Sequence, residues 1–321
     1  MNPTQNTTET LVQHSLANSF GIKVDPRAMV MGYATGTVGA PPVKPYVFDV
    51  SRLRDLLIFW ELGLKALKLR GDPAAGKTSL VEQFHARLNW PLKLVSCSQQ
   101  TEPFHLYGQL VPTETGTLRW VDGPVIHAAR TGTSVLLDEY NTLDPATATS
   151  LNALLEGYSI TIPETGEVIT PAPGFRVFAT ENAVTSRLSV AGRNVQDVAN
   201  DDRWMLMEVG YLDEVSEQGI VEGTMTKLGM EQDVAKMTST IMVKTANTIR
   251  ERYQSGDPDV EKPMSTRVLQ RWAMLTWGYR NIQKQGISPM AYSLPRAFAL
   301  PTKEMEKATM AIYHAVSGAG T

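Results

Sequence analysis

The chain has 321 residues and a mass of 35.3 kDa, which is enough for one large domain or for a large and a small domain. Hydrophobic residues make up 42% and charged residues 20% of the sequence, which excludes a wholly disordered, collagen-like or coiled-coil chain. With 30 basic and 33 acidic residues the net charge is -3, so this is not a broadly basic protein that coats nucleic acid or an anionic membrane.

The composition also bears on the compartment. Cys97 is the only cysteine and follows a predicted buried strand, so we expect an inert core thiol and no disulfide. The polar N-terminal stretch has no cationic start followed by an apolar core, which does not fit a secretory signal. The most apolar run, residues 56–69, is interrupted by charged side chains, which argues against a membrane span. We therefore expect a cytoplasmic protein without a membrane partner.

The first two thirds of the chain combine turn-rich and strand-forming segments. Residues 1–45 alternate polar tracts with turn formers, which predicts an N-terminal arm or linker. Beyond them, helix-length segments separate short apolar runs at 66–69, 92–97, 134–138, 175–180 and 204–210. Strands that alternate with helices predict a parallel sheet with right-handed crossovers. The fold class expected is therefore α/β.

Two stretches interrupt this alternation, and the end of the chain departs from it. Turn residues separate apolar residues at 102–123 and again at 159–170, and both stretches predict β-hairpin insertions. After Leu212 the strand pattern gives way to helix periodicity. We therefore expect a large α/β domain over residues 46–212 and a small α-helical lid domain with a C-terminal tail over residues 213–321.

The segment between the first predicted strand and the next helix matches the phosphate-binding pattern G-x-x-x-x-G-K-[ST]. Gly71 and Gly76 let the loop turn so that its backbone N–H groups face a β-phosphate. Lys77 supplies positive charge to the β- and γ-phosphates, and Thr78 offers a hydroxyl to Mg²⁺. The predicted ligands are ATP or ADP and Mg²⁺. The predicted nucleotide-binding residues are Gly71, Asp72, Pro73, Ala74, Ala75, Gly76, Lys77, Thr78 and Ser79.

Polar residues end two other strands of the predicted sheet. Asp138 and Glu139 follow the apolar run at 134–137, and Asn182 ends the run FRVFATEN. Ligands gather at the carboxyl ends of parallel strands. There, Asp138 can bind the metal together with Thr78, Glu139 can orient the attacking water, and Asn182 can hydrogen-bond that water or the γ-phosphate.

Two arginines are candidates for stabilising the charge that develops on the departing γ-phosphate. A guanidinium in this role often comes from a neighbouring subunit. Arg203 lies just before the last predicted strand, and Arg267 lies at a helix start in the second domain. With Glu139 and Asn182, they complete the predicted catalytic set.

Five motifs, GDPAAGKT, VLLDE, FATEN, DDRW and STRVLQRWA, resemble in order and spacing the AAA+ ATPases of the MoxR group. Within that group SFGI, VEQFHARLNWP and PAPGFRVFAT are similar to the CobS-like small subunit of aerobic cobaltochelatase. The resemblance implies a P-loop AAA+ core and gives each candidate residue a role. Lys77 and Thr78 become Walker A, Asp138 and Glu139 Walker B, Asn182 sensor 1, Arg203 the arginine finger in trans, and Arg267 sensor 2 in cis.

The resemblance also implies an assembly and a function. It implies a homo-hexameric ring with ATP at each interface, and it matches the two hairpins to the helix-2 insert and the pre-sensor-1 hairpin of the MoxR group. Such a ring remodels or activates a client protein complex together with a partner that carries a von Willebrand factor A domain, in a chelatase-like or enzyme-activating role.

Two other functions use the same site. A nucleic-acid-associated motor of restriction or defence type would need a basic pore surface, for which the sequence offers little beyond Arg119 and Arg130, so nucleic acid is not the expected partner. A structural ring that binds nucleotide only for assembly is disfavoured by Glu139, because sites that do not hydrolyse ATP usually lose that carboxylate.

Overall fold

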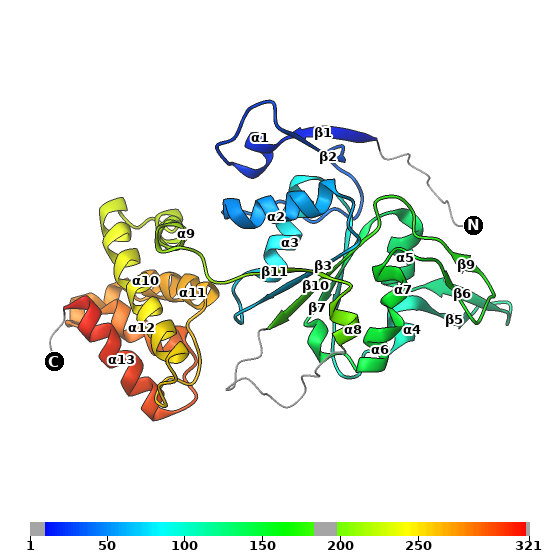
Figure 1. The fold of residues 1–321 in the computed structure, drawn as a ribbon. Coiled ribbons are helices and arrows are strands. Elements are labelled where there is room, and N and C mark those ends of the chain that lie inside the picture. The colour runs from blue at the N-terminus through cyan, green and yellow to red at the C-terminus, as the bar shows by residue number, and fades with distance from the viewer. Residues whose placement is uncertain (1–9, 183–197, 319–321) are drawn as a thin grey trace. The chain divides into compact units, whose positions relative to one another are not determined.

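The computed structural model describes residues 10–182 and 198–318 (Figure 1). The chain divides into two compact units. One, the α/β unit, contains Met1–Asp72 and Gly76–Val209, and the other, the helical unit, contains Pro73–Ala75 and Gly210–Thr321. The division after Val209 lies close to the domain boundary expected after Leu212.

A five-stranded parallel sheet forms the centre of the α/β unit. Its strands, in spatial order, are β11 (Met205–Glu208), β3 (Ala66–Gly71), β10 (Arg176–Asn182), β7 (Ser134–Asp138) and β4 (Leu92–Ser96). The predicted α/β class with a parallel sheet is therefore confirmed. Because β10 lies between β3 and β7, the carboxyl ends of three motif-bearing strands are neighbours.

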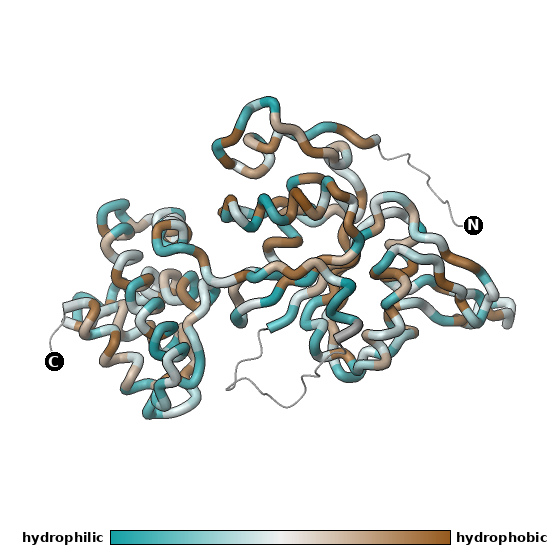
Figure 2. The backbone as a smooth tube through the Cα atoms, in the orientation of Figure 1, coloured by the Kyte–Doolittle hydropathy of each residue, from teal (hydrophilic) through white to brown (hydrophobic). Residues whose placement is uncertain are grey.

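Both faces of the sheet are covered by helices, because successive side chains of a strand point to opposite faces. Val135 and Leu137 belong to the core that includes residues of α5 (Pro124–Thr131) and α7 (Asn152–Leu155). Phe178 instead lies in ring contact with Phe59 of α2 (Val50–Glu61) and His85 of α3 (Lys77–Arg87). Figure 1 shows these helices around the sheet, and Figure 2 shows hydrophobic residues concentrated in the strands and in α2.

The two insertions are hairpins, as predicted. The first pairs β5 (Gly108–Pro112) with β6 (Leu118–Asp122), and the second pairs β8 (Ile160–Thr161) with β9 (Val168–Ile169). A short helix, α4 (Pro103–Tyr107), precedes the first hairpin and was not predicted. Its start is stabilised locally, because the proline fixes the first turn and the side chain of His105 accepts a hydrogen bond from the N–H of Glu102 at 3.0 Å. Three further short elements are η1 (Tyr140–Thr142), α6 (Pro145–Ser150) and α8 (Val198–Asp201).

The N-terminal segment differs from the expected arm or linker, since its described part packs on the rest of the α/β unit. It forms the antiparallel pair β1 (Leu11–Ser15) and β2 (Met29–Tyr33), joined by α1 (Leu16–Phe20). Phe20 stacks on Phe84 of α3 with 5.6 Å between ring centroids, and the N–H of Tyr33 donates to the Leu88 carbonyl at 2.8 Å. The turn-rich composition does not predict this packing, because the packing depends on aromatic contacts between residues that are distant in sequence.

Over residues 210–318 the regular elements of the helical unit are helices, as the periodicity predicts, while its residues 73–75 belong to the phosphate loop. Its core surrounds the fully buried Trp272 and includes Met242, Leu294 and Tyr313. Its elements are α9 (Glu214–Lys227), α10 (Gln232–Gln254), α11 (Thr266–Gly278), η2 (Arg280–Gln285), α12 (Pro289–Ala297) and α13 (Lys303–Ser317). Among the helices of residues 10–182 and 198–318, none combines the length and apolar composition that a membrane crossing requires.

Candidate functional site

The phosphate loop connects β3 to α3, and local geometry explains its glycines. Gly76 caps α3 with a φ of 91°, a conformation that side chains disfavour. Gly71 has a different reason, because a Cβ there would lie 1.9 Å from the Val209 carbonyl oxygen, so β11 can approach only a glycine. Ala74 also adopts a positive φ, of 56°. The loop therefore holds its shape against some backbone strain. Ser79 is exposed in the first turn of α3.

Lys77 lies at the centre of the site, with its side chain buried. Its Nζ donates to the carbonyl oxygens of Gly71 at 3.0 Å and Asp72 at 2.8 Å, and to Oδ1 of Asn182 at 3.0 Å. A buried ammonium group needs several hydrogen-bond acceptors, and these three acceptors are neutral oxygens. An anionic phosphate oxygen would be a stronger acceptor for the same group, so these residues fit a nucleotide tail.

Hydroxyl and carboxylate groups meet beside this lysine. The Thr78 hydroxyl donates to Oδ1 of Asp138 at 2.7 Å, and the Thr180 hydroxyl donates to the same oxygen at 2.5 Å. Hard oxygen donors of this kind are the ligands that Mg²⁺ takes, usually one or two carboxylates together with phosphate and water oxygens. Thr78 and Asp138 therefore fit the predicted metal-binding pair.

Glu139 adopts a left-handed backbone conformation directly after β7, with a φ of 58°. This conformation costs roughly 1–2 kcal/mol for a residue with a side chain. The N–H of Glu139 donates to the hydroxyl of Thr180 at 3.1 Å, and its side chain is exposed. Strained residues concentrate at functional sites. An exposed carboxylate beside the metal-binding pair can accept a proton from water.

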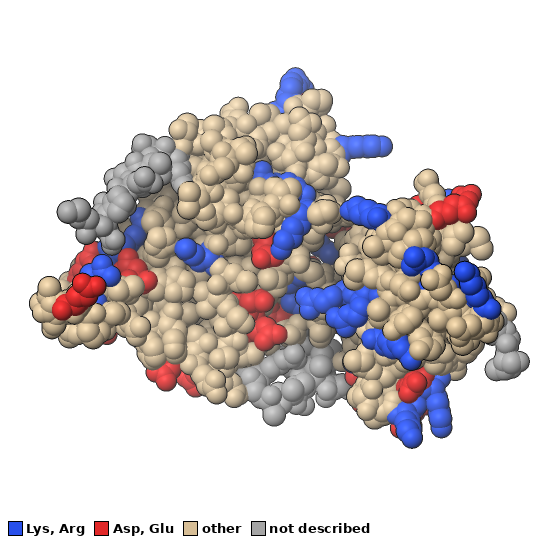
Figure 3. Space-filling view, turned by 180° about the vertical axis from the view of Figure 1, so that it is seen from behind, with Lys and Arg blue, Asp and Glu red and all other residues tan. Residues whose placement is uncertain are grey.

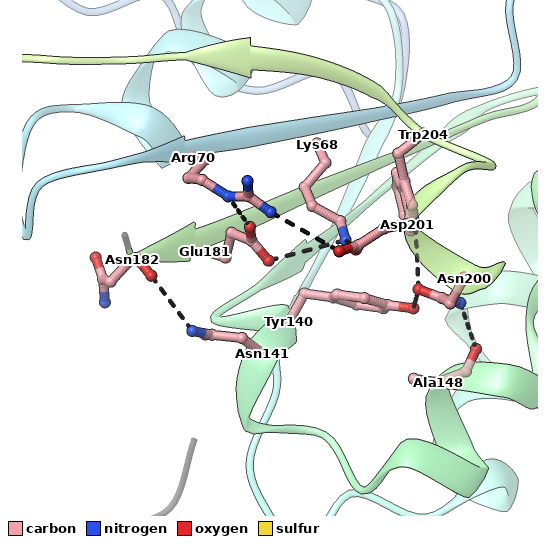
Figure 4. Close-up of polar contacts among 10 residues, drawn as sticks. All are labelled: Lys68, Arg70, Tyr140, Asn141, Ala148, Glu181, Asn182, Asn200, Asp201 and Trp204. Carbon is pink, nitrogen blue, oxygen red and sulfur yellow. Dashed lines mark hydrogen bonds and ion pairs between the residues drawn. The ribbon is translucent and has the colours of Figure 1, made fainter. Parts of the chain in front are cut away.

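The sequence prediction missed two residues of this cluster. Thr180 bonds both Asp138 and Glu139, and alternation along β10 places it on the same face as Asn182, a signal that was available. Asn141 gave no signal, because an asparagine in a turn is common. Its side-chain Nδ2 donates to the Asn182 carbonyl at 3.5 Å, as Figure 4 shows, while its buried Oδ1 has no hydrogen-bond partner among the described residues.

Arg203 lies near the amino-terminal ends of the strands, whereas the phosphate loop lies at their carboxyl ends. The register that pairs Met205 with Leu67 places Arg203 before the amino-terminal end of β3, whereas the loop begins at the carboxyl end of β3 with Gly71. At about 3.3 Å per residue, the length of this strand separates the two positions. The Arg203 side chain pairs with Glu156 and lines a cavity of about 650 Å³. Arg203 is therefore placed away from the phosphate loop of the same chain.

Arg267 is exposed in the first turn of α11, within the helical unit. The preceding residue, Thr266, donates its hydroxyl to Glu217 at 2.6 Å. Glu217 is fully buried and forms a two-pronged ion pair with Arg250, at 2.7 and 2.8 Å. This buried pair fixes the start of the helix that carries Arg267, because breaking it would leave a charge buried and unpaired.

Cys97 has no chemical role in this arrangement. The thiol is buried beside the end of β4, and burial, with a smaller effect from Asp138 and Glu139, raises its pKa to about 12. A thiol with this pKa stays protonated and unreactive at neutral pH. The predicted burial of this thiol in the core is confirmed.

One of the two arginines considered for the nucleic-acid alternative is already paired with carboxylates. On the face shown in Figure 3, lysine and arginine side chains share the surface with acidic and uncharged residues. Arg130, one of the two arginines considered for that role, is engaged in ion pairs with Asp122 at 2.7 Å and Glu167 at 2.5 Å. A phosphate backbone would have to compete with both carboxylates for it.

Two family models match the chain, one on each unit. The AAA domain (dynein-related subfamily) matches residues 66–203, which include the phosphate loop, Asp138, Glu139 and Asn182. The CbbQ/NirQ/NorQ C-terminal family matches residues 225–316.

Several curated proteins are similar to the chain. The aerobic cobaltochelatase subunit CobS of Sinorhizobium sp. is 28% identical over 269 residues, which cover 81% of this chain and 79% of that protein. An uncharacterized protein of Staphylococcus haemolyticus is 35% identical over 51% of this chain and 62% of its own length. Midasin of Giardia intestinalis is 32% identical over 44% of this chain, but the match spans only 3% of that much longer protein.

Proposed function

Since the chain is a MoxR-like AAA+ ATPase related to CobS, we propose that it hydrolyses ATP in a hexameric ring and thereby remodels or activates a partner protein complex. The observation that carries this proposal is the convergence of Lys77, Thr78, Asp138 and Asn182 through hydrogen bonds of 2.7 to 3.0 Å. Glu139 completes the group as a strained, exposed carboxylate.

In the proposed reaction the loop amides and Lys77 bind the phosphates of ATP. Thr78 and Asp138 would hold Mg²⁺, which when bound neutralises charge on the β- and γ-phosphates. Glu139 accepts a proton from water while the water oxygen bonds to the γ-phosphorus. The bond from that phosphorus to the bridging oxygen breaks, and ADP and inorganic phosphate leave. Asn182, already hydrogen-bonded to Lys77, is placed to orient the water or the γ-phosphate.

The two arginines act from different places in this proposal. Arg203 stabilises the transferring phosphoryl group of the neighbouring subunit. Its location near the amino-terminal ends of the strands, away from the phosphate loop of the same chain, supports this role. Arg267 acts in cis, from the anchored start of α11. A finger supplied by the next subunit requires a head-to-tail interface, and such interfaces generate a ring when the rotation between subunits closes.

The partner is proposed from the likeness to CobS, which is by name one subunit of a chelatase. We propose that this chain works with a protein that carries a von Willebrand factor A domain, and that ATP turnover acts on a client complex in a chelatase-like or enzyme-activating role. A movement between the two units when the γ-phosphate is lost would couple ATP hydrolysis to a change in the client complex.

The experiment that tests hydrolysis compares Glu139→Gln with Glu164→Gln, an exposed carboxylate in the second hairpin. Steady-state turnover, fluorescent-nucleotide affinity and particle size are measured for both. Glu139→Gln should bind ATP, trap the assembled ring and lose turnover by two orders of magnitude or more, about the loss expected for a missing catalytic base. Unchanged turnover in Glu139→Gln would contradict the proposed base.

A second experiment tests the partner. The ATP-trapped Glu139→Gln ring is used as bait, and co-purifying proteins are identified by mass spectrometry. Recovery of a protein with a von Willebrand factor A domain, dependent on ATP, supports the proposal. Tight, steeply salt-dependent DNA binding by the ring without such a protein would favour the motor alternative.

A further inference from the structure

A buried lysine joins the strands of the nucleotide site to the segment that carries Arg203. Lys68, in the middle of β3, is only 1% exposed. Its Nζ lies 2.5 Å from Oδ1 of Asp201 and 3.8 Å from Oε2 of Glu181. Arg70, on the same face of the strand, pairs with Glu181 and lies 4.0 Å from Asp201. Figure 4 shows the four side chains converging.

Aromatic rings enclose the lysine on two sides. Its Nζ lies 5.1 Å from the ring centroid of Tyr140 and 5.3 Å from that of Trp204. Both aromatic residues also donate a hydrogen bond to Oδ1 of Asn200. The Tyr140 hydroxyl donates at 2.9 Å, and the indole N–H of Trp204 donates at 3.3 Å. A buried ammonium group is costly unless it is paired, so the position of Lys68 strongly constrains these partners.

The partners of this lysine stand next to the proposed catalytic residues in sequence. Tyr140 directly follows Glu139, and Glu181 directly precedes Asn182. Asp201 lies two positions before Arg203, and Trp204 directly follows it. One lysine thus contacts the neighbours of the proposed base, the proposed sensor and the proposed finger. Buried positions of the described sheet include the apolar residues Leu67, Leu136 and Phe178, so packing alone does not require a charge here.

We propose that Lys68 and Asp201 are positioning residues that set the Arg203 finger according to the state of the nucleotide in the same subunit. The proposal rests on the proposed function, in which Arg203 acts in trans. Two carboxylates compete for one ammonium group, so a shift of Glu181 when Asn182 engages phosphate changes how firmly Asp201 is held. The backbone from Asp201 to Arg203 then carries that change to the interface with the next subunit.

The test uses Asp201→Asn, which keeps the shape and removes the charge, with Glu167→Gln as a matched control. Asp201 and Glu167 are 43% and 46% exposed and each pairs with a basic residue of the α/β unit, but Glu167 lies in the second hairpin. Asp201→Asn should lower kcat by about 10-fold to 100-fold, the range expected for a displaced catalytic group, while KM stays near the wild-type value. Glu167→Gln should match wild type in both constants.

Mixed rings separate a displaced finger from a damaged fold. Asp201→Asn subunits keep an intact hydrolytic site, and Glu139→Gln subunits keep an intact finger. In an equal mixture, about a quarter of the head-to-tail interfaces combine the two intact halves, so turnover should rise well above that of either variant alone. Lys68→Met should behave in the same way. A misfolded subunit would not be complemented.

A parallel mixture of Arg203→Ala with Glu139→Gln separates the two proposals. If that mixture is not complemented, the trans finger itself is wrong. If it is complemented but the Asp201→Asn and Lys68→Met mixtures are not, or if Asp201→Asn turns over like Glu167→Gln, the positioning role is overturned while the proposed function stands.

Discussion

Lys77 and Asn182 lie 105 positions apart in the sequence and meet through a hydrogen bond of 3.0 Å. The bond exists because the sheet register sets Asn182 beside Gly71, the first residue of the phosphate loop. The amide of β10 is thereby linked to the ammonium group that would hold the phosphates. A movement of the Lys77 side chain therefore also breaks or changes the hydrogen bond that Asn182 accepts.

This link predicts different defects for the two residues. Lys77→Met should abolish ATP binding, because Lys77 is the only basic residue of the loop from Gly71 to Ser79 that faces the β- and γ-phosphates in the proposed site. Asn182→Ala should bind ATP nearly normally but lose turnover by about 100-fold, the usual result of removing one group that acts at the reacting centre. Fluorescent-nucleotide titration and steady-state kinetics measure both effects. Equal loss of ATP binding in the two variants would show that Asn182 contributes to binding ATP and not specifically to the hydrolytic step.

The two glycines Gly71 and Gly219 predict opposite results for the same substitution. In Gly71→Ala the new methyl would lie 1.9 Å from the Val209 carbonyl oxygen, so β11 must move and the α/β unit should lose stability or fail to fold. In Gly219→Ala, within α9 and in open space, the helix should gain roughly 0.5–1 kcal/mol. Thermal melts measure both. A stable, active Gly71→Ala protein would mean that β11 does not approach the loop in this way.

Neighbouring alanines in the loop give a sharper test of its backbone. Ala74 has a φ of 56°, whereas Ala75 is not among the positive-φ residues of the described chain. Ala74→Gly should relieve strain and raise stability by up to about 1 kcal/mol, and Ala75→Gly should lower it by a similar amount. Both proteins should still bind ATP. If both substitutions destabilise equally, Ala74 does not adopt the left-handed conformation in solution.

His85 predicts how stability depends on pH. Its ring is fully buried, and burial lowers its pKa from 6.5 to about 3. Below pH 6.5 the unfolded chain therefore binds a proton that the folded chain excludes, so acid favours unfolding. The free energy of unfolding should fall as the pH drops below 6.5, with a slope that approaches about 1.4 kcal/mol per pH unit near pH 5.

The matched variants are His85→Phe and His105→Phe, the second at an exposed position. Chemical denaturation at several pH values should show the slope flattened only in His85→Phe. The slope is the diagnostic quantity, whatever each substitution does to absolute stability. A slope unchanged in His85→Phe would assign the acid sensitivity to other groups.

The sequence predicted those parts of the molecule that have a local signature. Strand and helix periodicity identified the sheet and the helical unit, and the loop pattern located Lys77 and Thr78 before any contact was known. The convergence of Asp138 and Asn182 followed from a general rule for parallel strands. Each of these inferences needed only neighbouring residues or a rule of topology.

What the sequence could not predict depends on contacts between distant segments. The N-terminal residues looked like a linker because the aromatic surface that receives Phe20 belongs to α3. Lys68 looked like an interruption of an apolar run, since its partner Asp201 is 133 positions away. The reason for Gly71 was also hidden, because the atom that excludes a side chain there belongs to Val209, which directly follows β11 and is distant in sequence.

The most direct test of the central claim is a structure of the Glu139→Gln protein with Mg²⁺ and a non-hydrolysable ATP analogue. We predict that the triphosphate occupies the loop from Gly71 to Thr78, and that Nζ of Lys77 leaves the Gly71 and Asp72 carbonyl oxygens to contact phosphate oxygens. We also predict that Thr78 and Asp138 lie at the metal. An empty loop at saturating analogue, with Lys77 still bonded to both carbonyls, would contradict the account.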